Sequence, residues 1–183
     1  MRRRRRWIGR AVAAVLLLAA GSWLFLMLRY PLKYEELVDR YSAENGLSPA
    51  FVYGVIRTES SFRPDAVSPI GARGLMQITE ETFEWVQWRM GDPDTTYEDL
   101  FDPETNIRYG TRLLALLLDE FNGEAEALAA YHAGWGSVKR WLAESEHSAD
   151  GVVLDHIPFG DTARYIPKVL STADIYRRLY GKE

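Results

Sequence analysis

The longest apolar run in the sequence lies near its start. Residues 11–28 carry no charged side chain, and only Gly21 and Ser22 interrupt their apolar character. As a helix, this run would extend about 27 Å, which is close to the thickness of the hydrocarbon core of a bilayer. The pattern therefore predicts a transmembrane helix over residues 11–29.

The basic residues around this run predict its orientation. Six arginines precede it, and only Arg29 and Lys33 follow it closely. The positive-inside rule then predicts a single-pass protein of the bacterial plasma membrane, with residues 1–10 in the cytoplasm and residues 30–183 outside. A cleaved signal peptide is the alternative, since the small residues 19–21 could be cut. Apolar residues continue past that point, which favours an uncleaved anchor.

Beyond residue 30, apolar positions recur at helical spacing between short polar loops. Start signals for helices stand at Ser48-Pro49, at Thr79 and at Asp102-Pro103. Strand signals are weak, and at most a short hairpin fits within residues 61–73. The pattern predicts one mostly α domain of about 150 residues. The predicted helices cover residues 34–45, 48–60, 79–90, 102–121, 124–133, 137–144 and 162–180.

The second of these helices carries a carboxylate on its apolar face. Val52, Val55 and Ile56 fall at i, i+3 and i+4, and Glu59 continues the same stripe at i+7. Burial and the negative end of the helix dipole both favour a neutral carboxylic acid there. A raised pKa would let Glu59 donate a proton to a leaving oxygen near neutral pH. The alternative is a structural role, in which Glu59 pairs with an arginine or protrudes at the helix end.

Composition and charge exclude several other kinds of chemistry. The chain has no cysteine, which rules out disulfides, thiolate metal sites and cysteine nucleophiles. His132, His147 and His156 are too irregularly spaced to predict a metal centre, and no cofactor is expected. Residues 30–183 contain 15 of the 22 Lys+Arg residues and all 26 Asp+Glu residues. Such an acidic domain is not expected to bind nucleic acid.

Four short motifs stand out along the chain, the first of them beginning at Glu59. They are Glu59-Ser60 with Phe62, Ala66, Ser68-Pro69, Gly71-Ala72 and Gly74-Leu75-Met76-Gln77; then Asn106-Ile107 with Gly110; then Ala130-Tyr131-His132-Ala133-Gly134; and last Pro158-Phe159, Asp161-Thr162 and Tyr165-Ile166. These motifs resemble, in the same order, the four signatures of the family 1 lytic transglycosylases. The resemblance covers about residues 34–180 and implies a lysozyme-like fold of the goose type.

The resemblance implies a peptidoglycan lytic transglycosylase that needs no metal or nucleotide. Glu59 would protonate the oxygen between N-acetylmuramic acid and N-acetylglucosamine, and then act as the base that helps a 1,6-anhydromuramyl end to form. The implied partners are peptidoglycan glycan strands and, through the N-terminal helix, the plasma membrane. One alternative is a lysozyme-like hydrolase, which would need a second carboxylate. The other is a non-catalytic, membrane-tethered module that binds the cell wall.

The resemblance also implies a set of substrate-binding residues around Glu59. Ser60 is expected to support the local geometry, Tyr131 to form a hydrogen bond near the acid, and Tyr165 to wall the site. The family usually has asparagine at the position of His132 and glutamate at that of Asp161, so these two contacts are expected to differ. The remaining members of the set are Ser68, Met76, Gln77 and Ala130.

Aromatic side chains make up 13% of the chain, which suits a ligand with C–H faces. Trp85, Trp88 and Trp135 are candidates to pack against sugar rings, and a place in the core or in an interface is their alternative. Phe83 and Trp141 are expected in the core.

Overall fold

The computed structural model describes residues 2–183, and within the first helix it leaves out the side chains of residues 2–6 and 8–12. The chain divides into two compact units, residues 1–33 and residues 34–183.

The first unit contains helix α1, Arg2–Arg29. Among the described residues, no helix is both long enough and apolar enough to cross a membrane. The predicted transmembrane helix over residues 11–29 is therefore not supported by the described part of the chain. In the predicted cytoplasmic segment 1–10, only the side chain of Trp7 is described. The side chains of residues 11 and 12 also lie outside the described part.

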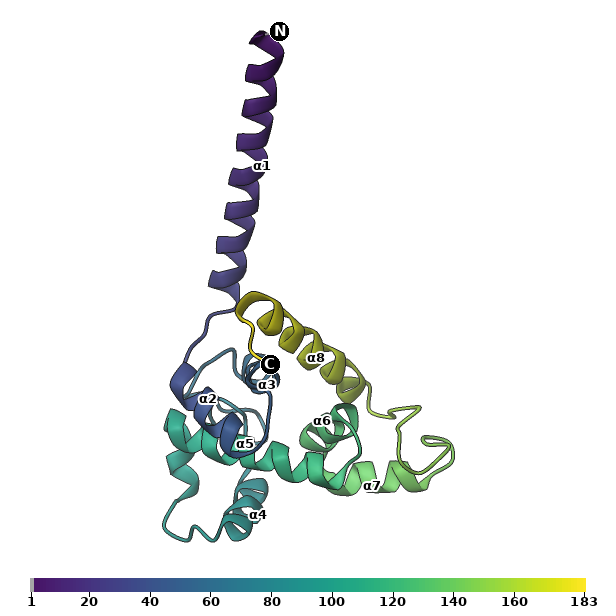
Figure 1. The fold of residues 1–183 in the computed structure, drawn as a ribbon. Coiled ribbons are helices and arrows are strands. Elements are labelled where there is room, and N and C mark those ends of the chain that lie inside the picture. The colour runs from purple at the N-terminus through teal and green to yellow at the C-terminus, as the bar shows by residue number, and fades with distance from the viewer. Residues whose placement is uncertain (1) are drawn as a thin grey trace. The chain divides into compact units, whose positions relative to one another are not determined.

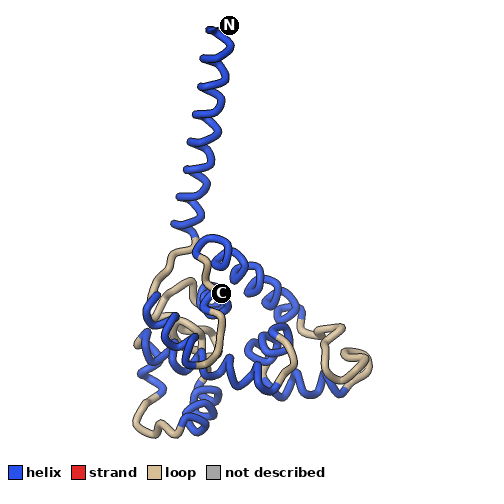
Figure 2. Tube along the Cα trace, viewed as in Figure 1, coloured by secondary structure: helices blue, strands red, loops and turns tan. Residues whose placement is uncertain are grey.

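The second unit is built from helices joined by loops, and Figure 2 shows no strand among the described residues. Every predicted helix is confirmed to within a few residues at its ends. One short 3-10 helix was not predicted, because five residues are too few to show a periodic pattern. The elements are α2 (Glu35–Glu44), α3 (Pro49–Glu59), α4 (Glu80–Met90), η1 (Tyr97–Phe101), α5 (Pro103–Glu120), α6 (Glu124–Ala133), α7 (Trp135–Ala143) and α8 (Gly160–Tyr180).

Local sequence explains where most of these helices begin. The side chains of Thr79 and Asp102 each accept a hydrogen bond from the backbone N–H three residues later, at 3.4 and 2.9 Å, so both predicted caps are confirmed. The predicted cap at Ser48 is wrong in one respect, because its side chain makes no capping hydrogen bond. Pro49 still favours a helix start there, since it has no N–H group to leave unpaired.

The core forms where α5 contacts α2, α4 and α6, and where α8 packs on α3 and α6 (Figure 1). The apolar stripe of α3 is fully buried at Val52, Val55 and Ile56. At Gly54, a Cβ atom would lie 2.8 Å from the carbonyl oxygen of Val169 in α8, so a larger residue would push the two helices apart. This close approach brings the end of α3, and with it Glu59, beside α8.

The loop between α3 and α4 has no regular hairpin. Residues 61–73 contribute only to isolated bridges, Val67 with Arg73 and Arg73 with Ile78. Backbone hydrogen bonds within the loop, such as that from the Ser68 N–H to the Ala72 carbonyl oxygen at 2.9 Å, satisfy many of its groups, and side chains pair with others. The site depends on those side chains.

Candidate active site

Glu59 is the last residue of α3 and is only partly exposed. The Tyr165 hydroxyl of α8 donates a hydrogen bond to Glu59 Oε1 at 2.6 Å. Within the described residues, Oε2 has no hydrogen-bond partner, and no ion pair involves this carboxylate.

Burial raises the pKa of Glu59 to about 7. The hydrogen bond from Tyr165 and the positive charge of Lys168 lower the pKa, but burial outweighs both. A carboxyl group with this pKa is protonated in about half of the molecules at neutral pH. It can therefore donate a proton in one step and accept one in the next.

Two tyrosines lie near the Glu59 carboxylate, and their hydroxyl groups donate to different acceptors. The Tyr131 hydroxyl donates to the carbonyl oxygen of Met76 at 2.5 Å, whereas the Tyr165 hydroxyl donates to Glu59. Burial, and second to it the negative charge of Glu59, raises the pKa of both tyrosines well above the ordinary value, so both remain donors. The resemblance led us to expect a hydrogen bond from Tyr131 near the acid and a place for Tyr165 in the wall of the site. The structure gives the direct contact to Tyr165, because the Met76 carbonyl holds the other hydroxyl.

Asn106 of α5 holds the loop beside Glu59 in place. Its Oδ1 accepts a hydrogen bond from the Met76 N–H at 2.8 Å. Its Nδ2 donates to the carbonyl oxygens of Leu100 and Arg73, at 2.8 and 3.1 Å. Gly74 allows this approach: its φ is 76°, and a Cβ atom there would lie 2.1 Å from Asn106 Nδ2. The buried amide therefore determines the path of the loop.

The side chains of Gln77 and Ser60 stabilise the loop through hydrogen bonds to its backbone. Gln77 has a φ of 50°, which is costly for a residue with a side chain. Its Nε2 offsets that cost by donating to the carbonyl oxygens of Gly74 and Ala66, at 2.8 and 3.1 Å. The buried Ser60 hydroxyl donates to the Leu75 carbonyl oxygen at 2.7 Å and so joins the end of α3 to the loop.

The predicted substrate-binding residues differ in their access to solvent. Gln77 and Ser68 are partly exposed, and the Ser68 hydroxyl accepts a hydrogen bond from the Ala72 N–H at 3.0 Å. Met76 is fully buried, and its N–H group and carbonyl oxygen are paired with Asn106 and Tyr131. Ala130 is buried in α6 but lines a pocket.

His132 of α6 and Asp161 of α8 line the same pocket, which has a volume of about 560 Å³ and lies at the start of α8. His132 Nδ1 is 3.0 Å from the Thr162 hydroxyl oxygen, and the imidazole centroid is 4.4 Å from that of Tyr165. Burial lowers the pKa of His132, and the charge of Asp161 opposes that effect. Asp161 itself is exposed and pairs with Arg164. A neutral imidazole therefore packs against the tyrosine that binds Glu59.

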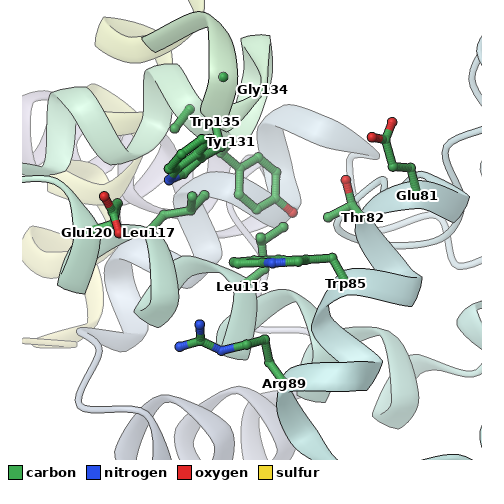
Figure 3. Close-up of a pocket in the computed structure, with 12 residues that line it drawn as sticks. Glu81, Thr82, Trp85, Arg89, Leu113, Leu117, Glu120, Tyr131, Gly134 and Trp135 are labelled. Atoms are coloured by element: carbon green, nitrogen blue, oxygen red, sulfur yellow. The ribbon is translucent and has the colours of Figure 1, made fainter. Parts of the chain in front are cut away.

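A groove of about 560 Å³ lies on the other side of Tyr131 (Figure 3). Trp85 and Trp135 line it and are 38% and 49% exposed, while Trp88 is 73% exposed and lies outside it. None of the three is in the core, whereas Phe83 and Trp141 are buried as predicted. The residues lining this groove are Glu81, Thr82, Trp85, Arg89, Leu113, Leu117, Glu120, Ala130, Tyr131, Gly134, Trp135 and Gly136.

No group of three or more metal-ligating side chains exists within the described part of the chain.

Comparison with known proteins matches this chain to one family. The family model described as "Transglycosylase SLT domain" matches residues 36–153. The soluble lytic murein transglycosylase of Salmonella typhimurium is 36% identical over 169 residues, which are 91% of this chain and 26% of that protein. The membrane-bound lytic murein transglycosylase C of Yersinia pestis is 32% identical over 80% of this chain and 47% of that protein. This chain therefore spans about a quarter of the soluble relative and about half of the membrane-bound one.

Solved structures agree with the sequence comparisons. The 70 kDa soluble lytic transglycosylase of Escherichia coli matches with a TM-score of 0.75 and 32% identity, over 90% of this chain and 27% of that chain. The complex of the 70 kDa soluble lytic transglycosylase with bulgecin A matches with a TM-score of 0.76 and 32% identity, over 91% of this chain and 27% of that chain. These matches confirm the predicted mostly α, lysozyme-like fold.

Proposed function

Because this chain belongs to the transglycosylase SLT domain family, we propose that it cuts peptidoglycan glycan strands as a lytic transglycosylase, with Glu59 as acid and base. The observation that carries this proposal is a single partly buried carboxyl group with a pKa of about 7, held by one tyrosine hydroxyl. A group of this kind suits two successive proton transfers at near-neutral pH.

The proposed reaction runs in two steps on the same carboxyl group. Protonated Glu59 gives its proton to the oxygen between N-acetylmuramic acid and N-acetylglucosamine, and the bond from that oxygen to the muramyl C1 breaks. The ionised Glu59 then takes the proton of the muramyl 6-hydroxyl, whose oxygen bonds to C1. The products are an N-acetylglucosamine end and a 1,6-anhydromuramyl end, and no water is consumed.

The other carboxylates near the site support a transglycosylase over a hydrolase. A hydrolytic route uses a second carboxylate to activate water or to attack C1. Asp161 is exposed and paired with Arg164, and Glu81 is an exposed residue of the groove lining. Both are exposed, unlike Glu59, and Asp161 already has an arginine as its partner.

Counting reducing ends tests the proposed reaction. When the full chain digests purified peptidoglycan, we expect the turbidity of the suspension to fall without a matching rise in reducing ends, because ring closure consumes each new muramyl end. A rise in reducing ends in proportion to the lost turbidity would mean hydrolysis.

The activity should depend on pH through Glu59. The first step needs the protonated acid, and its pKa is about 7. We therefore expect kcat/KM to fall about tenfold for each pH unit above about 7. Initial rates of soluble-product release between pH 5 and pH 9 measure this. As a control, glycan binding by the Glu59→Gln variant should change little over the same range. Rates that continue to rise up to pH 9 would contradict the assignment of Glu59 as the acid.

Tyr165→Phe should change both the rate and the pH profile. The tyrosine hydroxyl stabilises the ionised form of Glu59, so its loss should move the pH midpoint upward by about one unit and lower turnover about tenfold. Tyr41→Phe is a matched control, because the Tyr41 hydroxyl also donates to a carboxylate, that of Glu104, at 2.8 Å, between α2 and α5. Equal pH midpoints in the two variants would mean that Tyr165 does not tune the acid.

We further propose that the N-terminal helix anchors the protein to the plasma membrane, with residues 30–183 outside. The uncharged run at residues 11–28 and the arginines before it support this proposal, as does the membrane-bound relative. In cell fractionation, the full chain should remain in the membrane pellet after carbonate extraction, and a chain without residues 1–29 should not. Recovery of a shortened, soluble form would favour a cleaved signal peptide.

A further inference from the structure

We propose that the groove beside Tyr131 is a subsite in which Trp85 and Trp135 hold one N-acetylhexosamine ring of the glycan strand, away from the bond that is cut. This inference rests on the proposed action on glycan strands and assigns a sugar-binding role to two residues of this chain.

The two tryptophans reach the groove from different elements. Figure 3 shows Trp85 extending from α4 and Trp135 from the start of α7, with Leu117 of α5 also facing the groove. Leu113 and Leu117 are 6% and 2% exposed, so they form a buried apolar floor. The groove volume of about 560 Å³ lies within the range of small-ligand sites.

Neither the Trp85 indole nor the Trp135 indole is buried in the core. Helix α4 buries Phe83 and Val86, whereas Trp85 remains 38% exposed on another face. Trp135 opens α7 and is 49% exposed. Two large apolar rings that stay accessible in one groove form a surface suited to binding.

Each indole is held in place by a cation on a neighbouring turn. The Arg89 guanidinium carbon lies 5.8 Å from the ring centroid of Trp85, and Lys139 Nζ lies 5.4 Å from that of Trp135. Lys139 is itself paired with Glu120. Cations at these distances attract aromatic rings and restrict their motion. A ligand that packs against restricted rings loses less conformational entropy on binding.

The rim of the groove supplies partners for sugar hydroxyl groups. Glu81 and Thr82 lie at one end, and Arg89 and Glu120 lie near the other (Figure 3). A pyranose ring has apolar C–H faces and a polar edge, so it matches aromatic walls with hydrogen-bonding groups around them. The flat faces of two tryptophans favour a sugar ring over a flexible stem peptide.

Tyr131 connects the groove to the catalytic carboxylate. It lines the groove, and its hydroxyl binds the Met76 carbonyl in the loop beside Glu59. Burial and, second to it, the negative charge of Glu59 raise the pKa of this tyrosine. One glycan strand could therefore occupy the groove and the catalytic site together.

A binding measurement on the full chain tests the subsite. The probe is the β-1,4-linked tetramer of N-acetylglucosamine, and the parent protein carries Glu59→Gln, so that no turnover occurs. Trp85→Ala and Trp135→Ala should each raise the Kd in calorimetry about tenfold. Trp88→Ala is the matched control, because Trp88 is an exposed tryptophan of the same helix that lies outside the groove, and it should leave the Kd unchanged.

A second readout needs no substitution in the groove. With 5-fluorotryptophan incorporated into the parent protein, the tetramer should shift the fluorine resonances of Trp85 and Trp135, and not that of Trp88. Unchanged Kd values in both groove variants, or no binding of the tetramer by the parent, would overturn the proposal. So would a loss of affinity in those variants that is confined to strands bearing stem peptides. Product release from peptidoglycan by the unsubstituted chain decides the proposed activity separately.

Discussion

Glu59→Gln should lower the rate of product release from peptidoglycan by about 10³-fold, the range expected when a general acid/base is removed. Glutamine has nearly the shape of the protonated acid, and it can still accept the Tyr165 hydrogen bond that Glu59 Oε1 accepts at 2.6 Å. It cannot donate a proton to the leaving oxygen or remove one from the 6-hydroxyl, so both proposed steps are blocked. Rates of dye release from labelled peptidoglycan measure the loss.

Glu84→Gln is the matched control for this experiment. Glu84 is an exposed residue of α4 that does not line the groove, so the same change of charge should leave the rate within about twofold of the parent. Glycan binding by Glu59→Gln should be retained, which separates lost chemistry from lost substrate affinity. A Glu59→Gln protein that keeps a tenth or more of the parent rate would remove Glu59 from its proposed role.

The same substitution should stabilise the folded protein above neutral pH, by about 3 kcal/mol at pH 8. The folded-state pKa of Glu59, about 7, is above its ordinary value of 4.5, so ionisation costs free energy only in the folded state. That cost is absent at pH 4, where the group is protonated in both states. It grows as the pH rises from about 4.5 to about 7 and is complete above that. Glutamine removes the cost because it never ionises.

Urea unfolding of the two full-length proteins at pH 4 and pH 8 measures this effect. The difference in unfolding free energy should be near zero at pH 4 and should favour Glu59→Gln at pH 8. Glu84→Gln should show no comparable change between the two pH values, since that carboxylate is exposed. A Glu59→Gln protein that is no more stable than the parent at pH 8 would mean that burial does not raise the pKa of this acid.

The helical framework could be predicted from the sequence because its signals are local. Thr79 and Asp102 cap their helices through contacts only three residues away, and the stripe that ends at Glu59 follows from helical spacing alone. The burial of Phe83 and Trp141 follows from similar periodicity. These elements depend little on the rest of the fold.

The contacts that assemble the site could not be predicted in the same way. Tyr165 reaches Glu59 across 106 residues of sequence, and Tyr131 reaches Met76 across 55. The resemblance identified both tyrosines, but only the packing of α8 on α3 decides which hydroxyl binds the acid. Asn106 belonged to a matching segment, yet its two hydrogen bonds to the loop and its third to Leu100 of η1 have no signal in local spacing.

The negative net charge of residues 30–183 limits the ways in which the domain can recognise its substrate, and local motifs do not show this. Residues 30–183 carry 15 Lys+Arg against 26 Asp+Glu, so long-range attraction to the often acidic peptidoglycan is not expected. Recognition must then depend on short-range contacts, such as the indoles and hydrogen-bonding groups of the groove. Confinement by the proposed membrane anchor would raise the local concentration of substrate.

The most direct test of the central claim is mass spectrometry of the soluble products released from purified peptidoglycan by the full chain, beside its Glu59→Gln variant. We predict muropeptides with 1,6-anhydromuramyl ends, one water lighter than hydrolysed products, from the parent protein and none above background from the variant. Reducing muramyl ends from the parent, or anhydromuramyl products that persist in the variant, would contradict the assignment of Glu59 as the acid and base of a lytic transglycosylase.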